Sequence, residues 1–130
     1  MRTKRIFRKC LPEHAEQVNV IQWCRWNEGR YPCLKWLHAI PNGGKRDVVV
    51  AIRLKAEGVK SGVSDLFLPF PVAPKIGLYI EMKAMDGSLS DNQTDFLFYA
   101  QSVGYAAVVC FGSEQAINTI ENYLEGRLAP

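Results

Sequence analysis

Helix-like and strand-like patterns alternate along this chain of 130 residues, and the alternation limits its fold more than any other feature. In some segments apolar residues recur at helical spacing. Others are short apolar runs bounded by glycine or proline. The pattern predicts the order α-β-α-β-β-α-β-α. Such an order favours an α/β fold with a central mixed sheet flanked by helices.

Capping and turn residues set the expected boundaries of these elements. Helices are expected over residues 12–27 and 45–57, from Ser90 to Gly104, and from Ser113, its cap, to Gly126; strands are expected over residues 34–40, 63–69, 76–84 and 105–111. The run Val48–Val50 favours a strand locally, but residues 45–57 also fit a helix ending at Gly58, and we prefer the helix. Ser90 followed by Gln93 predicts a capping box.

Apolar stripes predict which side of two helices faces the core. The stripe of the first helix is Leu11, Ala15, Val18, Ile21 or Gln22, and Trp26; that of the third is Phe96, Tyr99, Ala100 and Val103.

The composition is that of one globular domain over residues 1–130, with a basic arm at residues 1–9. The net charge of +3 is too small to indicate nucleic acid by itself. No apolar run is long enough to span a membrane and no signal segment follows the basic start, so a cytoplasmic location is expected. The cysteines lack zinc-finger spacing and are expected to be reduced and mostly buried: Cys10, Cys24, Cys33 and Cys110.

The residues that carry chemistry lie in the segment 78–83. Because side chains alternate along a strand, Glu81 and Lys83 share one face of an otherwise apolar strand. The preceding strand opens with Asp65, and a hairpin connection would bring Asp65 within reach of Glu81. An acid and a lysine two residues apart are, taken alone, more often a surface ion pair of little consequence.

Two adjacent carboxylates repel each other unless a cation lies between them. Mg²⁺ or Mn²⁺ suits such oxygen ligands, and Lys83 beside the ion would stabilise charge on a phosphate. A third carboxylate is offered by Glu16 at the border of the first helical stripe, with Glu13 as its competitor. A glutamate at such a border is more often simply solvated. The set as a whole indicates hydrolysis of a phosphodiester.

Asp65 followed by Glu81-x-Lys83 on the next strand resembles the PD-(D/E)xK nuclease superfamily. The surrounding segments are similar to the VRR-NUC domain in their order and spacing: Glu16, residues 38–44, residues 58–65, residues 77–83, Gln93 and residues 104–109. Ser64 departs from the superfamily, because a proline often precedes the aspartate there.

The resemblance implies a restriction-endonuclease-like core and metal-dependent cleavage of DNA. It implies that the metal is held by Glu16, Asp65, Glu81 and the backbone carbonyl of Met82. Lys83 would be the catalytic lysine, and Gln93 would orient water, Lys83 or phosphate besides capping its helix. Contacts to DNA are expected from His38, Asn42, Lys45, Arg46 and Lys60, although His38 is equally readable as a strand-end histidine with a backbone partner.

Stand-alone members of this family are often phage-encoded and resemble Holliday junction resolvases that act as homodimers. The resemblance therefore implies a branched DNA substrate and a second copy of the chain as partner. Four aromatic residues are candidates for that interface or for ordinary core packing: Trp23, Trp26, Tyr31 and Trp36. Three alternatives stay open: a flap or nicking nuclease, a nucleic-acid-binding module without catalysis, and a structural subunit of a larger complex.

Overall fold

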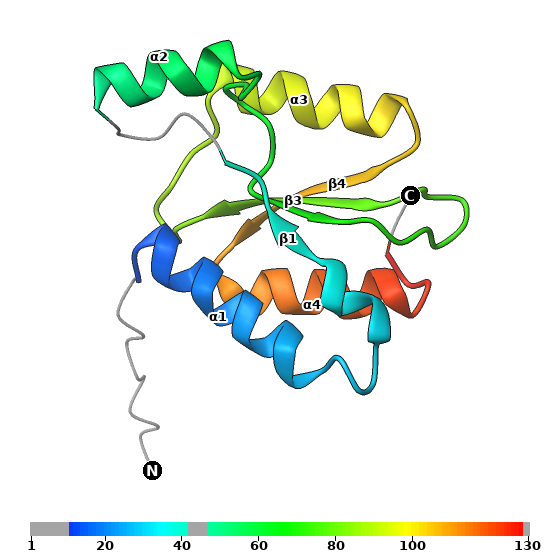
Figure 1. Cartoon of the computed structure of the whole chain (residues 1–130). Helices are drawn as coiled ribbons and strands as arrows, with labels where there is room; N and C mark the ends of the chain where they lie inside the picture. Colours follow the sequence, from blue (N-terminus) through cyan, green and yellow to red (C-terminus); the bar gives the residue numbers. More distant parts are fainter. Residues whose placement is uncertain (1–10, 42–46, 129–130) are drawn as a thin grey trace.

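A computed structural model describes residues 11–41 and 47–128 and contains one sheet with helices on both of its faces (Figure 1). The elements are α1 (Glu13–Trp26), the 3₁₀ helix η1 (Pro32–Trp36), β1 (His38–Ala39), α2 (Val48–Ala56), β2 (Leu66–Leu68), β3 (Leu78–Lys83), α3 (Asp91–Ser102), β4 (Ala106–Phe111) and α4 (Ser113–Leu124). Apart from η1, this is the predicted order, so the α/β prediction is confirmed. Within the described ranges, no helix has the length and apolar character needed to cross a bilayer.

The sheet has the strand order β1-β2-β3-β4. The pairs β1–β2 and β2–β3 are antiparallel, whereas β3–β4 is parallel. In Figure 1, α1 and α4 cover one face of the sheet, and α2 and α3 lie on the other side. The sheet is therefore mixed and β3 lies inside it, as the predicted site requires.

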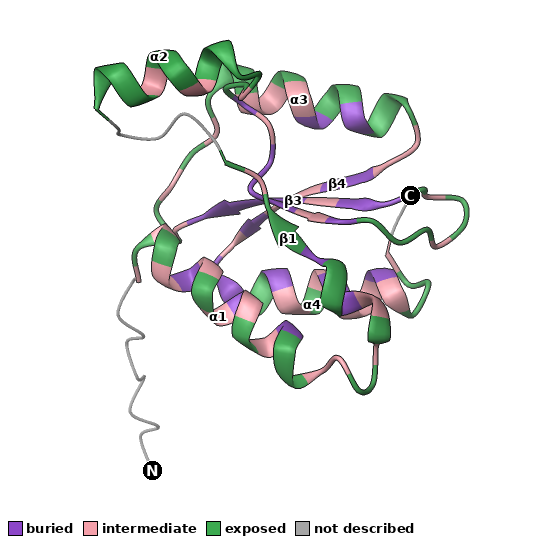
Figure 2. Ribbon diagram, in the orientation of Figure 1, coloured by how far each residue is buried: buried purple, intermediate pink, exposed green. Residues whose placement is uncertain are grey.

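Two apolar cores lie between these layers. Figure 2 shows buried residues along the strands and on the helices that flank the sheet. The larger core joins the sheet to α1 and α4, and its fully buried members include Val20, Leu66 and Ile120. The smaller core lies under α3, where Leu97 and Ala100 pack against Ala107. Since burying one such side chain is worth about 1.5–3 kcal/mol, the two cores hold β3 firmly between the helical layers.

The predicted inward face of α1 is partly wrong, although Ile21 packs against the core as expected. Val18 is 49% exposed and Trp26 is 75% exposed, whereas the buried residues are Glu16, Val20 and Cys24. These three residues follow one another at a spacing of four, which is a helical stripe in its own right. From the sequence alone, the large apolar side chains of Val18 and Trp26 favour the other face, because the stripe that is buried begins with a charged residue.

The predicted face of α3 is also partly wrong, since Tyr99 is 64% exposed and Val103 is 44% exposed. Leu97 and Ala100 are the buried residues of this helix. The prediction for the start of α4 needs correction too. Gly112 is the N-cap, and it provides no side-chain hydrogen bond to the helix. The backbone N–H of Ser113 donates to the carboxylate of Glu16 instead.

The strand expected over residues 34–40 is mostly the 3₁₀ helix η1, followed by the two-residue strand β1. Pro32 begins η1, and Leu34 and Leu37 are both buried while Lys35 and Trp36 between them are exposed. A spacing of three matches the 3₁₀ turn and not the alternation of a strand. By contrast, the helix preferred over residues 45–57 is confirmed as α2, with Asp47 accepting a hydrogen bond from the N–H of Val49.

Candidate active site

Asp65 and Glu81 meet where β2 and β3 begin to separate. The register pairs Leu66 with Ile80, so continuing it by one residue places Asp65 opposite Glu81. The Asp65 carboxylate accepts a hydrogen bond from the N–H of Met82 at 2.7 Å, and its carbonyl accepts one from Ile40 at 2.8 Å. Asp65 is thus fixed from both sides, with its carboxylate at the end of β3.

Glu81 lies in the middle of the sheet with only 1% of its surface exposed. Burial and, after it, the nearby charge of Asp65 raise the pKa of Glu81 to about 8, while Lys83 acts in the opposite direction. Within the described residues, Glu81 Oε2 has no hydrogen-bond donor. A buried carboxylate oxygen without a donor is costly, because ionisation then needs a cation close by.

Two side chains from different elements contact the other oxygen of Glu81. Gln93 Nε2 donates to Glu81 Oε1 at 2.8 Å, and Lys83 Nζ lies 3.8 Å from the same atom. Gln93 Oε1 also accepts the N–H of Ser90 at 2.9 Å, which completes the capping box of α3. The two roles considered for Gln93 are therefore geometrically compatible, and the cap fixes which end of the amide faces the carboxylate.

The two glutamates of α1 face different partners. The Glu16 carboxylate is buried and accepts the N–H of Ser113 at the start of α4. Glu13 is half-buried. Burial raises its pKa most, the charge of Asp65 raises it further, and the charge of Lys83 lowers it, so the charges of the site act on Glu13. The charge of Glu13 therefore interacts with Asp65 and Lys83, whereas the Glu16 carboxylate is bound to the start of α4. From the sequence the order is opposite, with Glu16 expected as the third carboxylate of the site and Glu13 as its competitor.

The positions of the two residues along α1 separate them once the covered face of the helix is known. Glu16 begins the stripe that continues through Val20 and Cys24 into the core, so its side chain is directed under the sheet. Glu13 lies one turn earlier, at the open end of the helix, where a side chain reaches past the core.

The donor atoms fit a hard divalent cation. The carbonyls of Gly77 and Lys83 accept hydrogen bonds from Ala106 and Gly112 on the β4 side, so the carbonyl of Met82 faces the opposite side, where Asp65 lies. Asp65, Glu81 and this carbonyl offer oxygen ligands only, and Glu81 Oε2 lacks any other partner among the described residues. No group of three acidic, histidine or cysteine side chains in the described part of the chain forms a complete metal cage. Mg²⁺ commonly uses one or two carboxylates together with water and substrate phosphate, so a cage is not required.

The predicted DNA contacts are only partly placed. His38 is exposed on β1, with its ring edge on Phe67 and its Nδ1–H donating to the carbonyl of Trp36 at 2.9 Å. Lys60 is exposed after α2. Asn42, Lys45 and Arg46 lie outside the described residues, as do the arm at 1–9 and Cys10. The described cysteines are free thiols; Cys24 and Cys110 are buried and Cys33 is half-buried.

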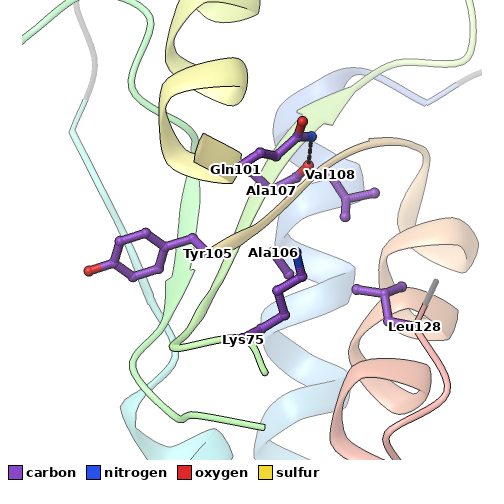
Figure 3. A pocket seen from close by; sticks show the side chains of 7 residues that line it. All are labelled: Lys75, Gln101, Tyr105, Ala106, Ala107, Val108 and Leu128. Atoms are coloured by element: carbon purple, nitrogen blue, oxygen red, sulfur yellow. Dashed lines mark hydrogen bonds between the residues drawn. The ribbon is translucent and has the colours of Figure 1, made fainter. Parts of the chain in front are cut away.

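A second hollow, formed by described residues, lacks the chemistry of this site. This hollow, shown in Figure 3, has a volume of about 240 Å³, lies beside β4 and is lined by Lys75, Gln101, Tyr105, Ala106, Ala107, Val108 and Leu128. It contains no carboxylate, and the Gln101 amide is engaged with the carbonyl of Ala107 at 2.9 Å (Figure 3). The cluster around Asp65 and Glu81 is therefore the candidate catalytic centre.

Comparison with known proteins agrees with this geometry. The family model of the VRR-NUC domain matches residues 3–114. A solved structure described as a VRR_NUC domain protein is similar with a TM-score of 0.76 and 27% sequence identity, over 90% of this chain and 91% of that chain. No curated protein matches. With a family model that covers most of its length and a matching fold, this chain belongs to the VRR-NUC domain family, which is nuclease-like.

Proposed function

We propose that this protein is a divalent-metal-dependent, structure-specific DNA endonuclease that resolves four-way junctions as a homodimer. One observation carries the proposal: Asp65 and Glu81 lie together at the end of β3, and Glu81 Oε2 has no donor within the described residues. A structural ion pair would not leave that oxygen without a partner. Family membership supports the nuclease activity.

Each residue of the site has a distinct task. Asp65, Glu81 and the Met82 carbonyl would hold Mg²⁺ or Mn²⁺, which supplies charge to polarise a phosphate oxygen and to lower the pKa of bound water. Lys83 places a positive charge beside Glu81, where it orients the attacking water or stabilises charge on the phosphate. Gln93 holds Glu81 in place through its amide.

Cleavage assays with defined substrates test this function. The purified full chain is incubated with a four-way junction, a flap, a nickable duplex and single strands, with Mg²⁺ or Mn²⁺ or with chelator. We expect paired symmetric nicks in the junction, and no cleavage with chelator. Asp65→Asn and Lys83→Ala should each reduce the rate by at least about a hundredfold. Full activity in either variant would refute the assignment of the site.

A flap or nicking nuclease is the second candidate, because the same residues would hydrolyse any suitably placed phosphodiester. Cleavage of the flap without paired nicks in the junction would favour it. Junction binding without any cleavage under all metal conditions would instead support a binding module.

The third carboxylate is tested by a matched pair of variants on α1. We assign the role of third carboxylate to Glu13, because its charge interacts with those of Asp65 and Lys83. The assignment made from the sequence is Glu16. Glu13→Gln should remove most cleavage without lowering the melting temperature. Glu16→Gln should weaken its hydrogen bond to Ser113, with a cost of about 1–3 kcal/mol in stability, and retain cleavage. The reverse result would return the role to Glu16.

A further inference from the structure

Helix α2 is the one helix of the described chain that has no buried residue. Val48, Val49 and Ile52 are 71%, 72% and 65% exposed, and Val50 is 41% exposed. A helix of nine residues is too short to be stable by itself in water. Because four apolar side chains in one short helix are left exposed, α2 has the character of an interaction surface.

A hollow of about 450 Å³ runs along the neighbouring side of the same helix. It is lined by Ala51, Leu54, Lys55, Val59, Lys60 and Ser61, and its walls are mostly apolar. At 100° per residue, Ala51 and Lys55 flank the stripe formed by Val48 and Ile52. One side of α2 therefore presents an apolar ridge and, beside it, an apolar hollow.

We propose that this surface binds a second copy of the same chain, with the two α2 helices packed antiparallel about a two-fold axis. A two-fold interface must be complementary to itself, and a ridge next to a hollow on one helix meets that condition. Ile52 of each copy enters the hollow of the other, where the small side chain of Ala51 permits close approach.

The charges of α2 support the antiparallel arrangement. Asp47 caps the N-terminus of the helix, while Arg53 and Lys55 lie in its last turn. Arg53 is paired with the C-cap residue Glu57 at 3.0 Å, so Lys55 carries the net positive charge of this end. When two copies run antiparallel, Asp47 of one copy faces the basic end of the other, and the two helix dipoles are also opposed. A parallel pairing would bring like charges together.

The inference rests on the proposed homodimer and assigns its surface. That surface is not the aromatic one considered from the sequence, since Trp26 ends α1 and Trp36 ends η1 on the other side of the sheet from α2 (Figure 1). The segment after α2 also reaches the site, because Ser61 Oγ accepts a bond from Asn92 Nδ2 at 3.3 Å, next to Gln93. The α2 interface thus connects the two-fold axis to both catalytic centres.

Sedimentation velocity on the full chain over a range of concentrations tests the interface. The wild type should be a dimer that dissociates on dilution. Ile52→Asp, and separately Val48→Asp, should raise the dimer dissociation constant at least tenfold. Trp36→Asp is the matched control, since it places the same charge on another exposed apolar residue and should leave the constant unchanged. Circular dichroism confirms folding, which these substitutions spare because neither residue is buried.

The outcomes separate the interface from the activity. A wild type that is monomeric at every concentration overturns the α2 interface, whether or not it cleaves DNA. So does a dimer that Trp36→Asp disrupts and both α2 variants leave intact. If Ile52→Asp is a monomer that still cleaves a flap but no longer makes paired nicks in a four-way junction, both the interface and the nuclease function stand. A dimer sensitive to Ile52→Asp but without cleavage of any DNA refutes the function alone.

Discussion

At the scale of single residues, Glu81 is under opposing demands. Its backbone belongs to a central strand whose residues Leu78, Ile80 and Met82 are in the core, and its own side chain is buried beside a second acid. Burial and Asp65 both favour the protonated form of Glu81, and Lys83 opposes them only in part. The fold therefore holds this carboxyl in surroundings that disfavour its ionised form. Such strongly shifted pKa values are common among functional groups.

The titration of Glu81 predicts how the metal-free protein responds to pH. Its ordinary pKa of 4.5 applies to the unfolded chain and rises to about 8 in the fold, so between these values the unfolded chain binds fewer protons. Stability is then fully present below about pH 4.5 and falls as the pH rises toward 8. Glu13 contributes with the same sign. Thermal unfolding in chelator should show a lower melting temperature at about pH 8 than at about pH 5.

The matched variant for this prediction is Glu81→Gln, which cannot ionise. It should flatten the pH dependence of the melting temperature in chelator and raise the melting temperature at about pH 8. A slope as steep as that of the wild type would show that other groups cause it. Addition of Mg²⁺ at the same pH should stabilise the wild type and leave Glu81→Gln almost unaffected.

Ser64 gives a second prediction at this scale. It is fully buried, and its hydroxyl has no partner among the described residues. A buried hydroxyl without a hydrogen bond costs about 1–3 kcal/mol, so Ser64→Ala should stabilise the protein by about 1 kcal/mol. Urea unfolding measures this change. Ser102→Ala, which removes an exposed hydroxyl bonded to Tyr99, is the control and should give no gain. A loss of stability in Ser64→Ala would reveal a partner for the hydroxyl.

At the scale of elements, the start of α3 and the site share one side chain. The amide oxygen of Gln93 caps the helix and its nitrogen holds Glu81, so glutamate at this position would keep the cap and repel the carboxylate. Gln93→Glu should preserve the helical content seen by circular dichroism and reduce cleavage at least tenfold. Gln93→Ala should lose part of the cap, at a cost of about 1 kcal/mol, with a smaller effect on cleavage. Cleavage at the wild-type rate by both variants would show that the hydrogen bond from Gln93 to Glu81 is dispensable.

Much of the fold and of the site is predictable from local patterns. The alternation of elements, the capping box and the shared face of Glu81 and Lys83 depend on residues close in sequence, and local rules describe them well. The turn of η1 escapes these rules because its two buried leucines, spaced by three, lie in a segment short and apolar enough to fit a strand.

The remaining errors have one physical source, which is tertiary packing. Nothing near Glu16 in the sequence shows that its carboxylate meets Ser113, since that contact spans 97 residues. Likewise, Val18 and Tyr99 are apolar enough to suggest core positions, yet both are exposed. Sequence periodicity tells which residues share a face, and only the packed fold tells which face is covered.

At the scale of the whole molecule, both edges of the described sheet carry features that hinder the addition of strands. The outer edge of β4 is occupied at both ends by glutamines: Gln101 donates to Ala107, and the N–H of Phe111 donates to Gln115 at 3.0 Å. The opposite edge is β1, which is only two residues long. Since unpaired strand edges are the usual templates for unwanted pairing, both edges are protected.

This protection predicts the behaviour of a double variant. Gln101→Ala with Gln115→Ala exposes the backbone of β4 without touching the cores, so aggregation on mild heating should begin earlier than in the wild type. Light scattering during a temperature ramp measures the onset. Gln22→Ala with Gln115→Ala alters one exposed glutamine away from the sheet and is the control. An unchanged onset in the first variant would show that the two amides do not guard the edge.

Protected sheet edges favour one kind of assembly in concentrated solution. Contacts between copies through helices use a finite surface with a defined end, whereas an open strand edge can add copies without limit. Concentrated solutions should therefore contain oligomers of finite size that dissociate on dilution, and thioflavin T fluorescence should not increase in them.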